Sequence, residues 1–164
     1  MTGRRGMHSI VEVPGSRRPR GYSSGVRARG TLLFVAGQVG WDAEERMVRG
    51  GFVPQLEQAL RNVKAVLEAG GARPEHLARV TLYVTDRRRY VRQARKVGEG
   101  WRRVLGRVYP AMTLVEVAGL LKRGALVEVE ATAVVPDGPA PARRGGGRGA
   151  GGGTPVKARP SRSG

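Results

Sequence analysis

The sequence predicts an α+β fold in which two helices pack on one face of a mixed sheet, in the order β-β-β-α-β-α-β-β. Three observations lead to this prediction. Apolar residues recur at helical spacing in segments 52–69 and 90–105. Apolar and polar residues alternate at strand spacing before, between and after these segments. The last two strand-like stretches, within 109–135, follow each other with only a turn between them.

Three strands are expected before the first helix. Residues 8–13 alternate weakly and stop at a Pro-Gly pair, which indicates a short edge strand. Residues 22–29 could form a second strand that turns at Gly30. Residues 31–39 are rich in large apolar side chains, as is typical of a strand buried on both faces. A polar loop, 40–51, then leads to the helix.

Segment 52–69 is the clearest helix. Its apolar residues are separated by four, four, three and four positions, which places them on one face. Pro54 lies in the first turn, where its missing N–H does no harm, and Gly70-Gly71 ends the helix. The face expected to meet the core consists of Phe52, Leu56, Leu60, Val63 and Leu67.

A strand and a second helix follow. Residues 79–86 alternate as a half-buried strand does, with Val and Leu on one side and Thr and Tyr on the other. Residues 90–105 show helical spacing and end before the Tyr-Pro pair at 109–110. Gly98 and Gly100 each cost this helix about 1 kcal/mol relative to Ala. We therefore expect the second helix to depend on packing.

The final two strands, joined by a turn at 122–124, carry a group of carboxylates. Alternation places Val115 on one face with Val127 and Val129, and we expect the helices to cover that face. The opposite face then holds Met112 together with Glu116, Glu128 and Glu130. Like charges side by side on a sheet are unfavourable, so the cluster faces water, meets cations or has raised pKa values. Apolar residues on this uncovered face favour a homo-oligomer that packs such faces together.

Composition divides the chain into a flexible leader at 1–7, a folded domain at 8–136 and a disordered Gly- and Arg-rich tail at 137–164. The chain contains no Cys, which excludes disulfides and thiolate zinc sites and agrees with a cytoplasmic location. No apolar run is long enough to cross a membrane, and no signal peptide is recognisable. We expect no contact with a membrane.

The net charge of +17 has two explanations. A basic chain attracts polyanions, and the tail sequence RRGGGRGAGGG is similar to Arg-Gly segments that contact RNA. Arg, Gly and Ala are all abundant, however, which is typical of a GC-rich genome, and no aromatic residue is interleaved in the tail. We favour compositional bias and a solubilising tail over nucleic-acid binding.

Six segments of the chain form a recognisable set in their order and spacing. They are Gly21-Tyr22-Ser23, LLFVAGQVGWD at 32–42, QLEQALRNVKAVLEAGGA at 55–72, VTLYVTD at 80–86, YPAMTLVEV at 109–117 and ALVEVEATAVV at 125–135. Together they resemble the RidA family, also called YjgF or endoribonuclease L-PSP. The resemblance implies a chorismate-mutase-like fold and a homotrimer with small-molecule clefts between subunits. It also implies hydrolysis of 2-aminoacrylate-type enamines and imines to 2-oxoacids and ammonia, with no metal or organic cofactor.

The same resemblance implies a set of site residues. Glu128 matches the Glu that orients or activates water, and Tyr22 matches a Tyr that contacts the substrate. Gly37 and Gln38 fall where the family lines its cleft. Met112 occupies the position of the Arg that pairs with the substrate carboxylate, so we expect a ligand whose facing end is neutral or apolar. The cations that could replace that Arg are Arg102, Arg103, Arg107, Lys122 and Arg123.

Three functions follow as hypotheses. The first is hydrolysis of a small reactive imine or enamine other than 2-aminoacrylate, with Glu128 positioning water. The second, motivated by Met112, is a non-catalytic trimer that binds a small ligand or a partner protein. The third is RNA binding or cleavage, which the charge motivates but no nuclease-like group of residues supports.

Overall fold

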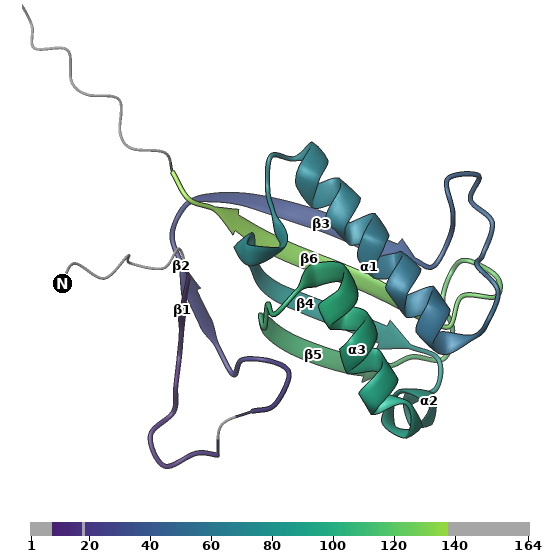
Figure 1. Ribbon diagram of the computed structural model, residues 1–164, viewed down its shortest axis with the longest axis horizontal. Coiled ribbons are helices and arrows are strands. Elements are labelled where there is room, and N and C mark those ends of the chain that lie inside the picture. The colour runs from purple at the N-terminus through teal and green to yellow at the C-terminus, as the bar shows by residue number, and fades with distance from the viewer. Residues whose placement is uncertain (1–7, 18, 138–164) are drawn as a thin grey trace, which may run out of the picture.

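The computed structural model of the protein describes residues 8–17 and 19–137. The leader predicted at 1–7 and the tail predicted at 137–164 lie outside these residues, apart from Asp137. A two-stranded N-terminal sheet stands beside a larger sheet that carries the helices on one face (Figure 1). No helix in the described parts of the chain has the length and apolar character needed to cross a bilayer.

The larger sheet is mixed, with the strand order β3-β6-β4-β5. β4 and β5 run parallel, whereas β6 is antiparallel to both of its neighbours, β3 and β4. The elements in chain order are β1 (His8–Ile10), β2 (Val26–Ala28), β3 (Thr31–Val39), α1 (Phe52–Ala69), a 3-10 turn (Pro74–His76), β4 (Leu77–Val84), α2 (Arg87–Arg92), α3 (Ala94–Leu105), β5 (Ala111–Glu116) and β6 (Val127–Val135).

The predicted α+β fold is confirmed, and the core lies between the larger sheet and helices α1 and α3. The apolar face of α1 is buried as its spacing predicts, with Leu56, Leu60 and Leu67 completely inaccessible. Gln55, also buried, links α1 to the turn before β6. Its Nε2 donates to the Gly124 carbonyl (3.0 Å), and its Oε1 accepts from the Leu126 N–H (2.8 Å).

The prediction of one helix over 90–105 was wrong, because that segment contains parts of two helices. α2 begins earlier, at Arg87, since the Asp86 side chain caps it by accepting the Arg88 N–H (2.8 Å). Gln93, with φ −112° and ψ 15°, interrupts the helix before α3. α3 then packs on α1 through its apolar residues, among them Val97 and Trp101.

The prediction that Met112 shares a face with Glu128 and Glu130 was also wrong. Met112 lies opposite Val80 in the register between β4 and β5, and therefore faces the helices. Val115, expected under the helices, lies opposite Tyr83 on the uncovered face.

The error arises because β4 separates β5 from β6, so the two strands form no hairpin. The turn at 122–124 exists, with the Ala125 N–H donating to the Lys122 carbonyl (3.1 Å). The connection between β5 and β6 is nevertheless so long that the orientation of side chains on one strand does not determine their orientation on the other. Glu116 is consequently separate from Glu128 and Glu130. It accepts the Arg87 N–H (3.0 Å) at the end of β5.

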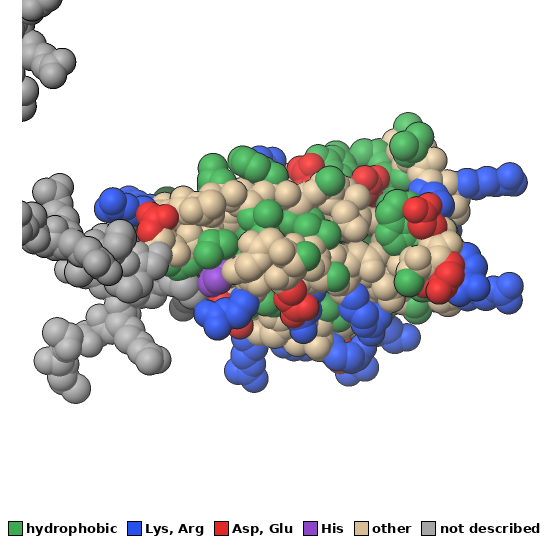
Figure 2. All heavy atoms as spheres, turned by 90° about the horizontal axis from the view of Figure 1, so that it is seen from above, with side chains coloured by type: hydrophobic (Ala, Val, Ile, Leu, Met, Phe, Trp, Pro, Cys, Tyr) green, Lys and Arg blue, Asp and Glu red, His purple; other side chains and the backbone are tan. Residues whose placement is uncertain are grey.

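Among the described residues, no helix lies over the other face of the larger sheet (Figure 1). On β3 it presents Leu32 and Phe34, which are 56% and 71% exposed. Seen from above, hydrophobic side chains gather along one long side of the molecule, and many Lys and Arg side chains lie along the other (Figure 2). Large apolar side chains therefore stand exposed on this sheet face, which also carries Glu128 and Glu130.

We expect Leu60→Ala to lower the free energy of unfolding by about 2–5 kcal/mol, because it leaves a cavity in a fully buried site. Chemical denaturation monitored by circular dichroism would measure this change. Leu121→Ala is the control: Leu121 is fully exposed, so its truncation should change stability by less than about 0.5 kcal/mol. Equal losses in the two variants would contradict this placement of the core.

Candidate functional site

Glu128 lies on the uncovered face of the sheet, against the backbone of Gly37. In the ladder it is opposite Val39 of β3 and Tyr83 of β4. The register of β3 shifts between Val35 and Gln38, and this bulge brings Gly37 beside the carboxylate. A Cβ at position 37 would overlap Glu128 Oε1. A side chain at position 37 would therefore displace the Glu128 carboxylate from this place.

Glu130, two residues further along the same face, already accepts a hydrogen bond from another side chain. The Tyr83 hydroxyl donates to Glu130 Oε1 (3.1 Å), and this hydrogen bond, with partial desolvation, raises the pKa of Tyr83 above its usual range. The Thr81 hydroxyl is buried beside this pair and has no hydrogen-bond partner among the described residues.

Glu128, by contrast, accepts no hydrogen bond and forms no ion pair with residues 8–17 or 19–137. Of the three strand carboxylates it is the one left open to a ligand or a water molecule.

Tyr22 is placed by a short segment that crosses the start of β5. The Ser23 hydroxyl donates to the Tyr109 carbonyl (2.6 Å), and the Ser23 N–H donates to the Pro110 carbonyl (2.9 Å). Ser23 also bridges to Ala111 in parallel register. These contacts hold Tyr22 next to Met112, with the Tyr22 side chain 46% exposed.

Tyr22 and Met112 line one cavity of about 760 Å³, which we call the α3 cavity. It lies between the 20–22 segment, β5 and α3, and its walls are mostly apolar and aromatic. Its volume is in the range of small-molecule sites. Besides Tyr22 and Met112, its lining includes Leu82, Tyr90, Val97, Trp101, Tyr109 and Leu114, together with Arg20 and Arg102.

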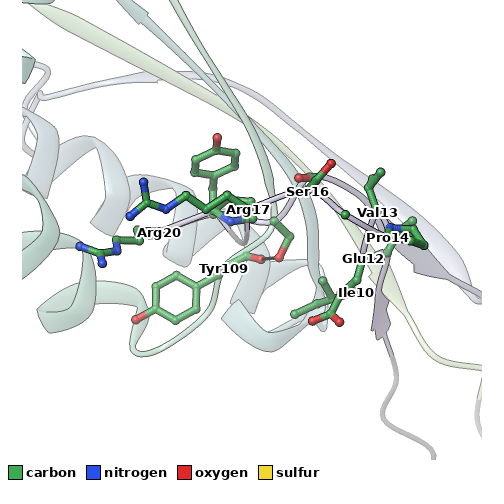
Figure 3. Close-up of a pocket in the computed structure, with 15 residues that line it drawn as sticks. Ile10, Glu12, Val13, Pro14, Ser16, Arg17, Arg20 and Tyr109 are labelled. Atoms are coloured by element: carbon green, nitrogen blue, oxygen red, sulfur yellow. Dashed lines mark hydrogen bonds between the residues drawn. The ribbon is translucent and has the colours of Figure 1, made fainter.

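A second cavity, of about 770 Å³, borders the first and shares Arg20, Gly21, Tyr22 and Tyr109 with it. It is enclosed by the N-terminal strand and the loop that follows. Figure 3 shows Arg17 and Arg20 extending alongside Tyr109, away from the apolar end at Ile10 and Pro14.

The predicted site residues thus form two groups within one chain. Tyr22 and Met112 meet at the α3 cavity on the helix side of the sheet, whereas Glu128 and Gly37 meet on the uncovered side. Gln38 is half-buried on β3, and its side-chain amide donates to the Ala36 carbonyl (3.1 Å). One chain by itself does not assemble the expected set.

Of the five cations that could replace the family Arg, only Arg102 lines the cavity of Met112. Arg103 pairs with Glu57, and the Lys122 ammonium lies 5.0 Å from the centroid of the Trp41 ring. Arg20 also lines the cavity, but sequence reasoning missed it. It lies in a loop without periodicity, and only its closeness to Tyr22 could have indicated its position.

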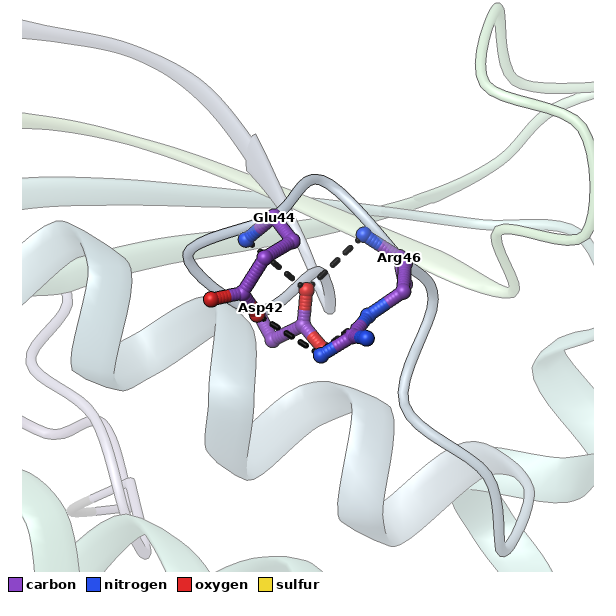
Figure 4. A network of polar contacts seen from close by, with 3 residues as sticks. All are labelled: Asp42, Glu44 and Arg46. Carbon is purple, nitrogen blue, oxygen red and sulfur yellow. Dashed lines mark hydrogen bonds and ion pairs between the residues drawn. The ribbon is translucent and has the colours of Figure 1, made fainter.

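The loop after β3 is stabilised by Asp42. Its Oδ1 accepts the backbone N–H groups of Glu44 (3.1 Å) and Arg46 (2.9 Å), and its Oδ2 accepts from Arg46 Nε at 3.0 Å (Figure 4). The Arg46 N–H, followed by the Arg46 guanidinium, holds the pKa of Asp42 below its usual range. This network is structural.

Within the described residues, no three His, Asp or Glu side chains gather as metal ligands.

Comparison with known proteins gives consistent matches over the same part of the chain. A family model described as "Endoribonuclease L-PSP" matches residues 16–135. A RutC family protein of Pyrococcus horikoshii is 34% identical over 129 residues, which are 77% of this chain and 98% of that protein. A human 2-iminobutanoate/2-iminopropanoate deaminase is 29% identical over 127 residues, 77% of this chain and 87% of that protein. A crystal structure of a Rid-family protein from Yersinia pestis superposes with a TM-score of 0.69 at 27% identity, covering 79% of this chain and 99% of that one.

Proposed function

This chain belongs to the RidA/YjgF family, whose family model is described as endoribonuclease L-PSP, and on that basis we propose that it hydrolyses a small reactive imine or enamine. The observation that carries the proposal is the Glu128 carboxylate, which lies against Gly37 without a partner among the described residues. The imine deaminases among its relatives support the same reaction class.

In the proposed reaction Glu128 acts as the general base. Its carboxylate accepts a proton from water as the water oxygen bonds to the imine carbon and the C=N π electrons move to nitrogen, and Glu128 then passes that proton to the nitrogen. The C–N bond of the resulting carbinolamine breaks as its hydroxyl proton is transferred to nitrogen, so that ammonia leaves and the carbonyl forms. The sum is one imine and one water converted to one carbonyl compound and one ammonia, and Glu128 returns to its carboxylate form.

We further propose that the site is completed between copies of the chain in a homotrimer. Within one chain Tyr22 and Met112 lie on the opposite side of the sheet from Glu128. The uncovered face with Leu32 and Phe34 would bury its apolar surface against a neighbouring copy. Such packing would bring the Glu128 of one copy toward the Tyr22 and Met112 of another.

Met112 would set the choice of substrate. A thioether offers no charge to a carboxylate on the reacting carbon, whereas an Arg there would add roughly 1.5–3 kcal/mol of charge-assisted binding. We therefore propose that the preferred substrate is not 2-aminoacrylate but an imine or enamine with a neutral or apolar group at this position.

We expect Met112→Arg to improve kcat/KM for 2-aminoacrylate by about 10–100-fold, because one charge-assisted contact is gained. Ammonia release from enamine generated in the assay would measure the change. Met112→Leu, which keeps the position apolar, should show no gain. If Met112→Arg folds and shows no gain either, Met112 does not face the substrate carboxylate.

The test of the proposed function is the rate of ammonia release from a panel of imines generated in situ, neutral ones included, compared with buffer alone. We expect rates above background for at least one neutral or apolar imine. Background rates across the whole panel would contradict the proposal.

A second candidate function is ligand binding without turnover, which the apolar residue at position 112 favours. It predicts saturable binding to the α3 cavity and no ammonia release from any imine of the panel.

A further inference from the structure

We infer that the α3 cavity binds a small carboxylate with an aromatic or branched apolar body, and that Arg20 and Arg102 hold the carboxylate at the mouth. That this ligand is the substrate rests on the proposed function, whereas the binding itself does not. The carboxylate would then lie away from Met112, at a different end of the ligand.

The interior of the cavity favours an apolar body. Trp101 and Val97 are buried on the α3 side, and Leu82 is buried on the sheet side. Met112 adds a flexible, polarizable surface between them. Tyr90 is partly enclosed there by an edge-to-face contact with Phe52, and burial raises the pKa of Tyr90 above its usual range. A pocket with such walls excludes a ligand that is charged along its whole length.

The mouth of the cavity favours an anion. Arg20 and Arg102 are both exposed residues that line the cavity, and neither forms an ion pair with a carboxylate among the described residues. Arg102 folds back along α3, with its Nη1 3.4 Å from the position that a Cβ of Gly98 would take. Neighbouring arginines differ in this respect, since Arg103 pairs with Glu57 and Arg95 with Glu99.

The two features select a carboxylate of intermediate size. A guanidinium accepts a carboxylate in a two-pronged geometry, which fixes one end of the ligand at the mouth. An apolar body such as the phenylpropyl group of 4-phenylbutanoate would extend from the mouth toward Met112 within the cavity of about 760 Å³. Inorganic phosphate meets the guanidinium requirement but has no apolar body, so it should bind weakly.

The test is isothermal titration of the full chain with 4-phenylbutanoate, its neutral amide and inorganic phosphate. We expect saturable binding of the carboxylate, at least tenfold weaker binding of the amide, and no saturation with phosphate. Equal affinity for the carboxylate and the amide, or tighter binding of phosphate, would overturn the inference. Failure of all three to bind would overturn it as well.

Two variants with one control locate the ligand. Arg102→Gln should weaken carboxylate binding by about 5–10-fold, the effect expected of one partly exposed charge-assisted contact. Arg95→Gln makes the same charge change on the same helix outside the cavity and should have no effect. Equal effects of Arg102→Gln and Arg95→Gln would show non-specific attraction and would overturn the inference.

Gly98→Leu tests the interior. Gly98 lines the cavity and meets only Arg102, and replacing a helical Gly favours the helix, so the variant should fold while obstructing the cavity. We expect binding to fall by at least tenfold, and unchanged binding would overturn the placement.

Carboxylate binding without turnover of any imine would end the proposed function and leave this inference standing. Turnover of neutral imines without carboxylate binding would support the proposed function and overturn this inference.

Discussion

Replacing Glu128 with Gln should reduce imine hydrolysis by about 10²–10⁴-fold, the usual contribution of a general base. The amide is nearly the same size as the carboxylate but cannot accept the proton from water. Because Glu128 forms no hydrogen bond or ion pair with the described residues, the substitution removes no contact of the folded chain. The unfolding midpoint should therefore stay close to that of the wild type. Ammonia release at saturating imine and thermal denaturation measure the two quantities.

Glu130→Gln is the matched control for this variant. Glu130 is on the same strand and the same face, but its carboxylate accepts the Tyr83 hydroxyl. We expect a much smaller change in rate and a normalised pKa of Tyr83, since the hydrogen bond to a carboxylate is the main cause of its elevation. A larger loss of activity in Glu130→Gln than in Glu128→Gln would show that Glu128 is not the general base.

Gly37→Ala should also reduce activity strongly, by tenfold or more, while stability changes little. The added Cβ would overlap Glu128 Oε1, and the carboxylate is the far end of a flexible side chain that can swing away. The fold is then preserved, but the base leaves its position against β3, and small displacements of a catalytic group are costly. Steady-state kinetics and denaturation of the same preparation would separate the two effects.

Gly119→Ala provides the control for a glycine without such a constraint. A Cβ at Gly119 meets no atom within 4 Å, so activity should be unchanged. If Gly37→Ala behaves like Gly119→Ala, the contact between Gly37 and Glu128 has no part in the reaction.

The periodic elements were predictable because their spacing is local. The boundaries expected for 31–39 and 52–69 agree with those of β3 and α1. The break at Gln93 was not predictable from apolar spacing. The Asp86 cap fixes where α2 begins, and the spacing of apolar residues contains no information about caps.

The faces of β5 could not be predicted from alternation alone. Alternation gives the relative orientation of residues within one strand, whereas the phase between two strands depends on which strands are neighbours. Placing β4 between β5 and β6 moved Met112 to the helix side and Val115 to the uncovered side.

The candidate site was predictable only as a set of residues, and its assembly was not. The sequence resemblance indicated Glu128, Gly37, Tyr22 and Met112, and the fold brings Glu128 to Gly37 and Tyr22 to Met112. The separation of these pairs by the sheet follows from strand order, which no local pattern encodes. Arg20 and Arg102 enter the site through tertiary packing in the same way.

The most direct test of the account compares wild-type protein and Glu128→Gln on one neutral imine at equal concentrations, with ammonia and the carbonyl product followed together. The account predicts that the wild type releases both products in equal amounts well above the rate in buffer, and that the variant stays close to that background. A wild-type rate equal to the buffer rate, or full activity in Glu128→Gln, would contradict it.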